Sequence, residues 1–391
     1  MSTDVQAVNA LTARWAQACD GASTTLSGLG VWPLLALLTP GADDVVRAEL
    51  ERATGVAAAE SGAAARNLMD LLSHADAVRA ALGLWTRAEL PLEPAWVDQL
   101  PQGTRGTLTG DPAADRSMLD TWAARQTDGL IDRMPIMVDA AIQLVLASAL
   151  LVRTEWEHAF ADNRWRIDRG PWAAGDLSGL TRTTTDLDDV AVADTAAGPL
   201  TVVRVAGGND VDVHLILGGE ERAAGDVLAA GIGAVCGDAS RTVGSALPDG
   251  NPGPGVSIRM VSASSMRPTV QLRTVRFTVE GDHDLLAHAD LFGLATAATG
   301  GRHFPGVSEE PLALAQARQS AVATFSARGF EAAAVTVMAM KASFAAAQHS
   351  VRRVEVRVDR PFGFVATHRP TGLALVAGWV ADPEPWSEPE L

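Results

Sequence analysis

The sequence has few cysteines, no long apolar run and no recognisable export signal. Its two cysteines, Cys19 and Cys236, cannot form a disulfide framework, and we expect both to be free, buried thiols. The most apolar run, residues 140–152, is interrupted by Gln143 and is too short to span a bilayer. Residues 1–7 carry no basic group and no apolar stretch, so no signal peptide is visible. We expect a soluble cytoplasmic protein, with secretion by another route left open.

Positive charge is also scarce. The 391 residues include 31 Lys and Arg against 47 Asp and Glu, which gives a formal net charge of −16 at pH 7. This charge argues against nucleic acid and against anionic membrane surfaces as partners. Hydrophobic residues make up 47% of the chain and charged residues 20%, which suffices for a sizeable core and excludes a globally disordered chain.

Motifs of common enzymes are absent as well. The sequence contains no Gly-x-Ser-x-Gly nucleophile turn, no His-Glu-x-x-His pair and no Walker-type lysine loop. Three glycines within residues 231–237 depart from the dinucleotide-binding spacing by one residue, and no acidic residue follows at the required distance. We therefore expect neither an enzyme nor a bound cofactor.

Two groups of aspartate and histidine are the remaining candidates for chemistry. Asp210, Asp212 and His214 alternate along a predicted strand and so share one face, as the ligands of a metal ion would. An open face of this kind is more often a solvated outer surface, and we expect no metal. Residues 282–284, Asp-His-Asp, follow Gly281 and predict a turn rather than a catalytic pair.

What the sequence does contain is a helical first part and a strand-rich remainder. Apolar residues at helical spacing within residues 5–90 predict three helices, and residues 115–132 predict a further helix that runs into a turn. Residues 140–152 are apolar at both alternating sets of positions, as expected of a strand buried on both faces. The pattern indicates an α+β fold. Six later strands are predicted over residues 200–205, 211–217, 256–260, 275–279, 354–358 and 373–380.

A run of small residues occupies positions 329–336, which read Gly-Phe-Glu-Ala-Ala-Ala-Val-Thr. Small side chains allow an extended segment to slide between strands that are already packed, where larger ones would need additional volume. The run resembles the reactive-loop hinge of serpins, whose usual form is Gly-Thr-Glu-Ala-Ala-Ala-Ala-Thr. Residues 359–364, 371–373 and 378–383 resemble the closing motifs of that family, Arg-Pro-Phe, Thr-Gly and Gly-x-Val-x-Asn-Pro. By this resemblance the chain is identified as a divergent serpin.

The resemblance implies one serpin-like domain over residues 5–384, followed by an acidic, proline-containing tail over residues 385–391. The domain would have mixed β-sheets, a helix-rich N-terminal half and an exposed reactive loop. The implied function is a monomeric suicide-substrate inhibitor of a serine protease, with cysteine proteases as a second class of target. In that mechanism the cleaved loop enters the main sheet as a new strand and traps the acyl-enzyme. A non-inhibitory binding protein with the same fold is the alternative.

The resemblance also assigns roles to individual residues. The scissile bond falls at Ser343–Phe344, counted from the hinge glycine. The alternative bond is Lys341–Ala342, which would suit a trypsin-like target. The hinge consists of Gly329, Phe330, Glu331, Ala332, Ala333 and Ala334. The region where the sheet opens consists of Ser27, Gly30, Ser148, Trp156 and Gln319.

Two departures from the family pattern bear on whether the chain inhibits. Serpins usually carry Thr or Ser at the position of Phe330, so we expect overpacking of about 1–3 kcal/mol to slow the entry of this ring between strands. At the sheet opening, Gly30, Ser148 and Gln319 stand where serpins carry Ser, Asn and His, which predicts a thinner hydrogen-bond network. Both departures favour the non-inhibitory alternative, whereas the uncharged residues 332–340 favour the inhibitor.

Overall fold

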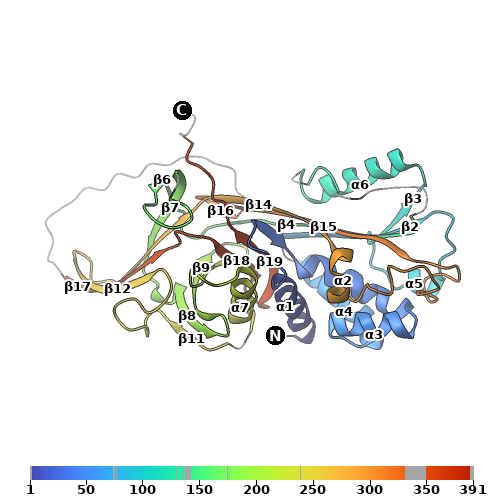
Figure 1. Ribbon diagram of the computed structural model, residues 1–391, viewed down its shortest axis with the longest axis horizontal. Coiled ribbons are helices and arrows are strands. Elements are labelled where there is room, and N and C mark those ends of the chain that lie inside the picture. The colour runs from blue at the N-terminus through green and yellow to red at the C-terminus, as the bar shows by residue number, and fades with distance from the viewer. Residues whose placement is uncertain are drawn as a thin grey trace.

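The computed structural model of the chain describes residues 2–73, 75, 77–129, 131–134, 136, 142–173, 175–237, 239–330 and 349–387. Three β-sheets and the helices that pack on them make up this part of the chain (Figure 1). Among the described residues, no helix is both long and apolar enough to cross a membrane.

Helices dominate the first part of the chain, as predicted, but residues 5–73 contain four helices and not the expected three, and residues 78–87 form a strand. The most buried is α2, in which every residue is shielded from solvent. The further helix predicted around residue 115 begins earlier, because the Asp111 side chain caps it and Pro112 fits its first position, and it ends earlier, at Gln126. The helices are α1 (Thr3–Ala16), α2 (Gly28–Leu38), α3 (Asp44–Thr54), α4 (Ala58–Ser73), α5 (Pro94–Val97), α6 (Pro112–Gln126), α7 (Ala224–Cys236) and α8 (Ala289–Phe292).

The main sheet has two parallel strands, β4 and β15, at its centre. All nine residues of β4 are buried, which confirms a strand within residues 140–152. Helices α2 and α4 lie on one face of this sheet and α6 on the other (Figure 1). Its long strands are, in spatial order, β3 (Arg105–Leu108), β2 (Val78–Arg87), β4 (Leu144–Val152), β15 (Leu314–Phe325) and β14 (Phe277–Asp284). Two short strands extend one end, β16 (Gly329–Phe330) and β5 (Thr154–Glu155).

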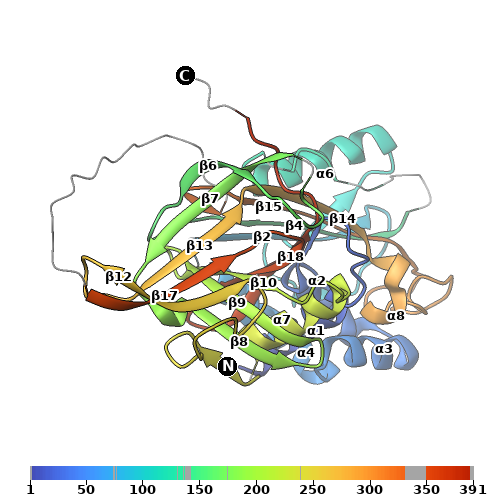
Figure 2. The ribbon, with the colours of Figure 1, turned by 60° about the vertical axis from the view of Figure 1, so that its left-hand side comes forward.

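The two other sheets contain five of the six strands predicted late in the sequence. One has five strands, in the order β12 (Val256–Ala263), β17 (His349–Arg357), β13 (Thr269–Val275), β7 (Asp176–Thr184) and β6 (Ala161–Arg166) (Figure 2). The other has seven, in the order β1 (Thr24–Leu26), β19 (Leu373–Val380), β18 (Phe362–His368), β10 (Val211–Leu217), β9 (Gly198–Ala206), β8 (Val190–Thr195) and β11 (Arg241–Val243). Helix α7 packs on the second of these.

Of the two predictions about residues 275–284, the strand is confirmed with a different start and the turn is wrong. The strand predicted over 275–279 spans a break, since β13 ends at Val275 and β14 begins at Phe277. Residues 282–284, predicted as a turn, belong to β14. Gly281 suggested the turn, but its role is close packing, because a Cβ atom there would lie 2.0 Å from the backbone oxygen of Thr25.

Candidate functional site

The hinge glycine and its neighbour form strand β16 and pair on both sides. Phe330 stands opposite Phe325 of β15 and opposite Thr154 of β5, and both pairings are antiparallel. Phe277 of β14 already occupies the other side of Phe325. Strand β16 therefore lies on the side of β15 that faces β4, at the end of the line along which β4 and β15 meet.

The Phe330 ring is buried among other aromatic side chains. Its exposed fraction is 1%, and its centroid lies 6.1 Å from that of Phe364. We expected this ring to enter between the strands only during loop insertion, and that expectation is wrong, because the ring is already inside in the resting structure. The surrounding aromatic cluster consists of Trp156, Phe160, Phe277, Phe325, Phe362 and Phe364.

The turn that leads from β15 into β16 is held by hydrogen bonds from the chain that follows β4. The backbone N–H of Trp156 donates to the carbonyl of Arg328 at 2.8 Å, and that of Phe160 donates to Ala327 at 2.7 Å. The Trp156 indole N–H donates to the carbonyl of Ser326 at 2.9 Å. Trp156, assigned to the sheet-opening region from the sequence, thus fixes the start of the loop.

The other hinge positions, Glu331 to Ala334, and both candidate scissile bonds, Lys341–Ala342 and Ser343–Phe344, lie outside the described residues. The described chain resumes at His349 in β17, within the five-stranded sheet. The loop therefore starts at the end of the main sheet and returns into a different sheet.

The four remaining sheet-opening residues come together where β4 meets β15. Gln319 of β15 stands opposite Ser148 of β4, and its side-chain nitrogen donates to the Ser148 hydroxyl at 3.3 Å. The same amide accepts from the backbone N–H of Ser27 and donates to the backbone carbonyl of Ser27, both at 2.8 Å. We call this group, with Gly30, the seam cluster.

Gly30 makes room for the Gln319 amide. A Cβ atom at this position would lie 2.6 Å from the Gln319 nitrogen and 3.1 Å from the Ser148 oxygen. The predicted thinner network is therefore compensated in part, since a longer amide occupies the space that a side chain at position 30 would take. Ser27 also caps α2, accepting from the backbone N–H of Gly30 at 3.3 Å.

The face that carries Asp212 and His214 is buried, so the prediction of a solvated surface is wrong. Arg369 explains the burial of the carboxylate: its guanidinium donates to the two Asp212 oxygens at 3.0 and 2.8 Å. Burial lowers the pKa of His214 to about 4, which keeps this imidazole neutral at pH 7. Asp210 lies at the strand's turn, at 3.9 Å from Arg369. The group is a structural ion pair.

No other constellation in the described part of the chain offers obvious chemistry. No group of three or more His, Cys, Asp or Glu side chains there is placed to hold a metal ion. Both cysteines are free thiols, as predicted, and Cys236 is buried while Cys19 is partly buried. Burial raises the pKa of Cys236 to about 12 and that of Cys19 to about 11, so neither is an activated nucleophile.

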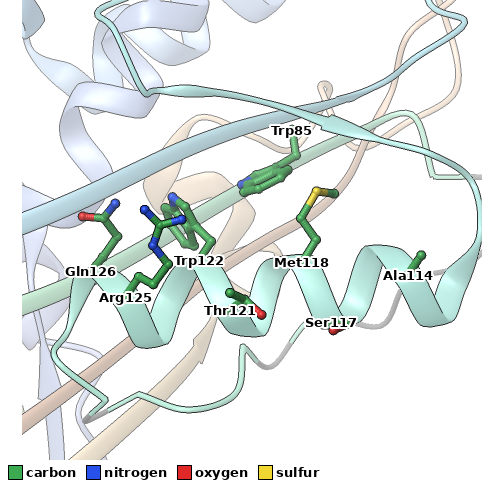
Figure 3. Close-up of a pocket in the computed structure, with 8 residues that line it drawn as sticks. All are labelled: Trp85, Ala114, Ser117, Met118, Thr121, Trp122, Arg125 and Gln126. Carbon is green, nitrogen blue, oxygen red and sulfur yellow. The ribbon is translucent and has the colours of Figure 1, made fainter.

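A cavity of about 510 Å³ lies between α6 and β2 (Figure 3). Trp85 of β2 faces Met118 and Trp122 of α6, and the two indole rings meet edge to face at 5.8 Å. Arg125 is the one charged side chain among the residues that line the cavity. Among the described residues that line it, the cavity therefore offers no acid–base pair.

Comparison with known proteins gives a family match. A family model described as "Serpin (serine protease inhibitor)" matches residues 6–169 and 257–383, which together make up more than half of the chain. Alpha-1-antitrypsin 1-3 of Mus musculus is 33% identical over 119 residues, which are 30% of this chain and 27% of that protein. Alpha-1-antitrypsin 1-2 of Mus musculus is 31% identical over 128 residues, 32% of this chain and 29% of that protein. The alignments thus span under a third of these relatives.

Solved structures match over nearly the whole chain. A thyroxine-binding globulin complex with thyroxine has a TM-score of 0.72 at 15% identity, covering 97% of this chain and 99% of that one. Native protease nexin-1 with heparin has a TM-score of 0.72 at 14% identity, covering 97% and 98%. A serpin from the trematode Schistosoma haematobium has a TM-score of 0.70 at 14% identity, covering 98% and 100%. The predicted α+β fold is confirmed.

Proposed function

Because the chain belongs to the serpin family, we propose that it is a suicide-substrate inhibitor of a serine protease, with cysteine proteases as the second class of target. The protease nucleophile attacks the scissile carbonyl in the loop, and an acyl bond to the enzyme replaces the peptide bond. The amine of the broken bond takes up a proton and becomes the new amino terminus of the C-terminal segment, which stays in the fold through β17, β18 and β19. The freed hinge segment then enters between β4 and β15. The attached protease is pulled along and distorted before water hydrolyses the acyl bond.

The register of the hinge is the observation that carries this proposal. Phe330 stands between Phe325 and Thr154. Gln319 precedes Phe325 by six residues, and its partner Ser148 precedes Thr154 by six residues as well. A strand that continues from Phe330 therefore meets β4 and β15 in one common register, and insertion requires no slip of either strand.

The length of the available space also supports insertion. In the same register, residue 340 reaches Leu144, the first residue of β4. Residues 332–340 carry no charge, so the uncharged run ends where the space ends. Residue Thr336 would lie level with Gln319 and Ser148 and, since directly opposed residues share a face, would offer its hydroxyl in place of the bond that insertion breaks.

The experiment is a denaturing gel assay of covalent complex against cleaved protein, with trypsin-, chymotrypsin- and elastase-like proteases. We expect a complex with a protease that cuts the loop. We expect Ala334→Arg to abolish it, because position 334 would face inward in a strand that continued in the register of Phe330. Ala347→Arg is the matched control, since it adds the same charge beyond the length of the space. If proteases cleave the loop cleanly and no complex forms with any of them, the inhibitory proposal fails.

The same complex identifies the scissile bond. A released C-terminal fragment that begins at Phe344 assigns the bait to Ser343 and to an enzyme with a small specificity pocket. A fragment that begins at Ala342 assigns it to Lys341 and to a trypsin-like target. The mass of the fragment decides between the two bonds.

A non-inhibitory binding protein is the second candidate. The closed seam cluster favours it, since the Gln319 amide must give up its bond to Ser148 before a strand can enter. One structural neighbour, the thyroxine-binding globulin, is described in complex with the small ligand thyroxine. For the present chain this candidate predicts loop cleavage without complex and without a gain in stability.

A further inference from the structure

Four arginines of the five-stranded sheet stand in two directly opposed pairs. Arg259 of β12 is in register with Arg353 of β17, and Arg357 of β17 is in register with Arg273 of β13. Like charges directly opposite each other on neighbouring strands destabilise a sheet. We call these four residues the arginine pairs.

The arginine pairs are only partly neutralised. Glu355 lies between them and contacts Arg259 at 2.6 Å and Arg353 at 3.8 Å. Asp359 lies 3.8 Å from Arg357 at the end of β17. Two carboxylates thus face four guanidinium groups. In addition, the Nε atoms of Arg273 and Arg353 are buried without a hydrogen-bond partner among the described residues.

The arginine pairs lie on the outer face of the sheet. Alternate residues of β17, Val354 and Val356, are buried on the opposite face. The side chains of Arg259 and Arg357 are 59% and 57% exposed. Arg273 is more enclosed, with its guanidinium 4.4 Å above the Trp165 ring and its outer nitrogen 3.4 Å from the Asn163 oxygen.

Contacts within the fold offset this concentration of positive charge only in part, although the guanidinium groups of both Arg273 and Arg357 lie over the Trp165 ring, at 4.4 and 5.8 Å from its centre. The chain as a whole carries a formal charge of −16, so this face is opposite in sign to the net charge of the protein. Burial, and to a lesser extent the nearby charge of Arg357, lowers the pKa of Arg273 below its ordinary value. Contact with a negatively charged partner would offset the electrostatic repulsion between the opposed arginines.

The position of the arginine pairs indicates which partner would contact them. Strand β17, which carries Arg353 and Arg357, follows directly after the loop and lies between β12 and β13 (Figure 2). A protein held at the loop would therefore lie next to this face. Because this step assumes a protease bound at the loop, it rests on the proposed function.

We propose that the arginine pairs dock an acidic surface patch of the target protease. Guanidinium groups match carboxylates in geometry, and opposite charge on the partner speeds encounter. A sulfated polysaccharide is the competing partner, but Glu355 in the middle of the face would repel a uniformly negative chain. A protein surface can instead place a cation opposite Glu355.

The test uses a fluorescein-labelled peptide of glutamates, because this probe needs no protease and no cleavage. Fluorescence polarisation should show binding that weakens as the ionic strength is raised above about 0.1 M, where the Debye length falls below about 10 Å. The double variant Arg259→Ser/Arg353→Ser should weaken binding about tenfold, since two charge contacts are lost. The control Arg52→Ser/Arg116→Ser removes the same charge from exposed arginines of α3 and α6 and should change binding less than about twofold.

Three results would overturn the proposal: no binding of the peptide at low salt, equal weakening by both double variants, or tight binding of a heparin octasaccharide with none of the peptide. The last result would assign the face to a polysaccharide. These outcomes are separate from failure of the inhibitory function, which the gel assay reports. Thermal melts of both double variants confirm folding, and loss of a like-charge contact should leave the Arg259→Ser/Arg353→Ser variant no less stable than the control.

Discussion

Cleavage of the loop at a single bond should stabilise the protein. Lys341 is the only lysine in the sequence, so a lysine-specific endopeptidase has one site in the whole chain. Continuation of the hinge register places residue 341 at the start of β15. A cut after Lys341 therefore frees residues 331–340, the segment that matches the space between the two central strands in length.

The size of the effect follows from the new strand. Ten residues that each gain about one net ladder hydrogen bond contribute about 1 kcal/mol each, or on the order of 10 kcal/mol. The parallel pairing of β4 with β15 is given up, but each strand regains a neighbour, so no edge is left unpaired. With an unfolding entropy of about 2.1 cal/mol/K per residue over 391 residues, the melting temperature should rise by about 12 °C.

The assay is a thermal melt before and after complete cleavage. Mass spectrometry first verifies a single cut, with a C-terminal fragment that begins at Ala342. Ala334→Arg serves as the control, since it should be cut at the same bond without gaining stability. An unchanged melting temperature after a clean cut at Lys341 would refute the reasoning, because the loop would then have no place in the sheet. Resistance of the folded chain to the endopeptidase would refute the exposed loop itself.

Two further predictions concern the hinge and the seam cluster. Phe330→Ala should lower the free energy of unfolding by about 3–5 kcal/mol in a denaturant titration, because it empties a fully buried aromatic site. The fraction of protease trapped in the gel assay should stay within a factor of about two, and a severalfold rise would show that the ring does impede insertion. Gly30→Ala should destabilise the protein by about 1–3 kcal/mol, because its Cβ would meet the hydrogen-bonded Gln319 nitrogen at 2.6 Å. In a Gln319→Ala background the same change should be neutral or stabilising, and additive effects in this double-mutant cycle would contradict the contact.

Much of the fold is predictable from local patterns. The apolar run at residues 140–152 predicts the central strand, since apolar residues occupy both alternating sets of positions, as expected of a strand covered on both faces. The proposed hinge is identified by its resemblance to a family motif and not by its small residues alone, since triple alanines also occur at residues 57–59, 63–65 and 345–347. Bounds are less predictable where strands follow each other closely, as at Arg276 between β13 and β14, because no turn residue marks the break.

The misjudged site residues depend on partners that are distant in sequence. Asp212 is polar and alternates with His214, which suggests a wet surface. Its burial depends on an ion pair with Arg369, 157 residues later, and no local sequence pattern predicts that pairing. Likewise, Gly30 and Gln319 each look like a weakened position when considered alone. Their complementarity becomes evident only when the amide is seen to occupy the space above the glycine.

Phe330 illustrates how the resting structure changes the energetic argument. The ring is flanked by Phe325 and Thr154 before cleavage, and the common register keeps the same neighbours after insertion. A contact present in both states cancels from the difference between them, so its overpacking neither drives nor opposes insertion. In the proposed mechanism, the step that sets the rate would then be farther along the sheet, where the hydrogen bond between Gln319 and Ser148 at 3.3 Å would have to open before the strand could pass. Inhibition would require the hydrogen bonds of the Gln319 amide to Ser148 and Ser27 to open faster than water hydrolyses the acyl bond to the protease.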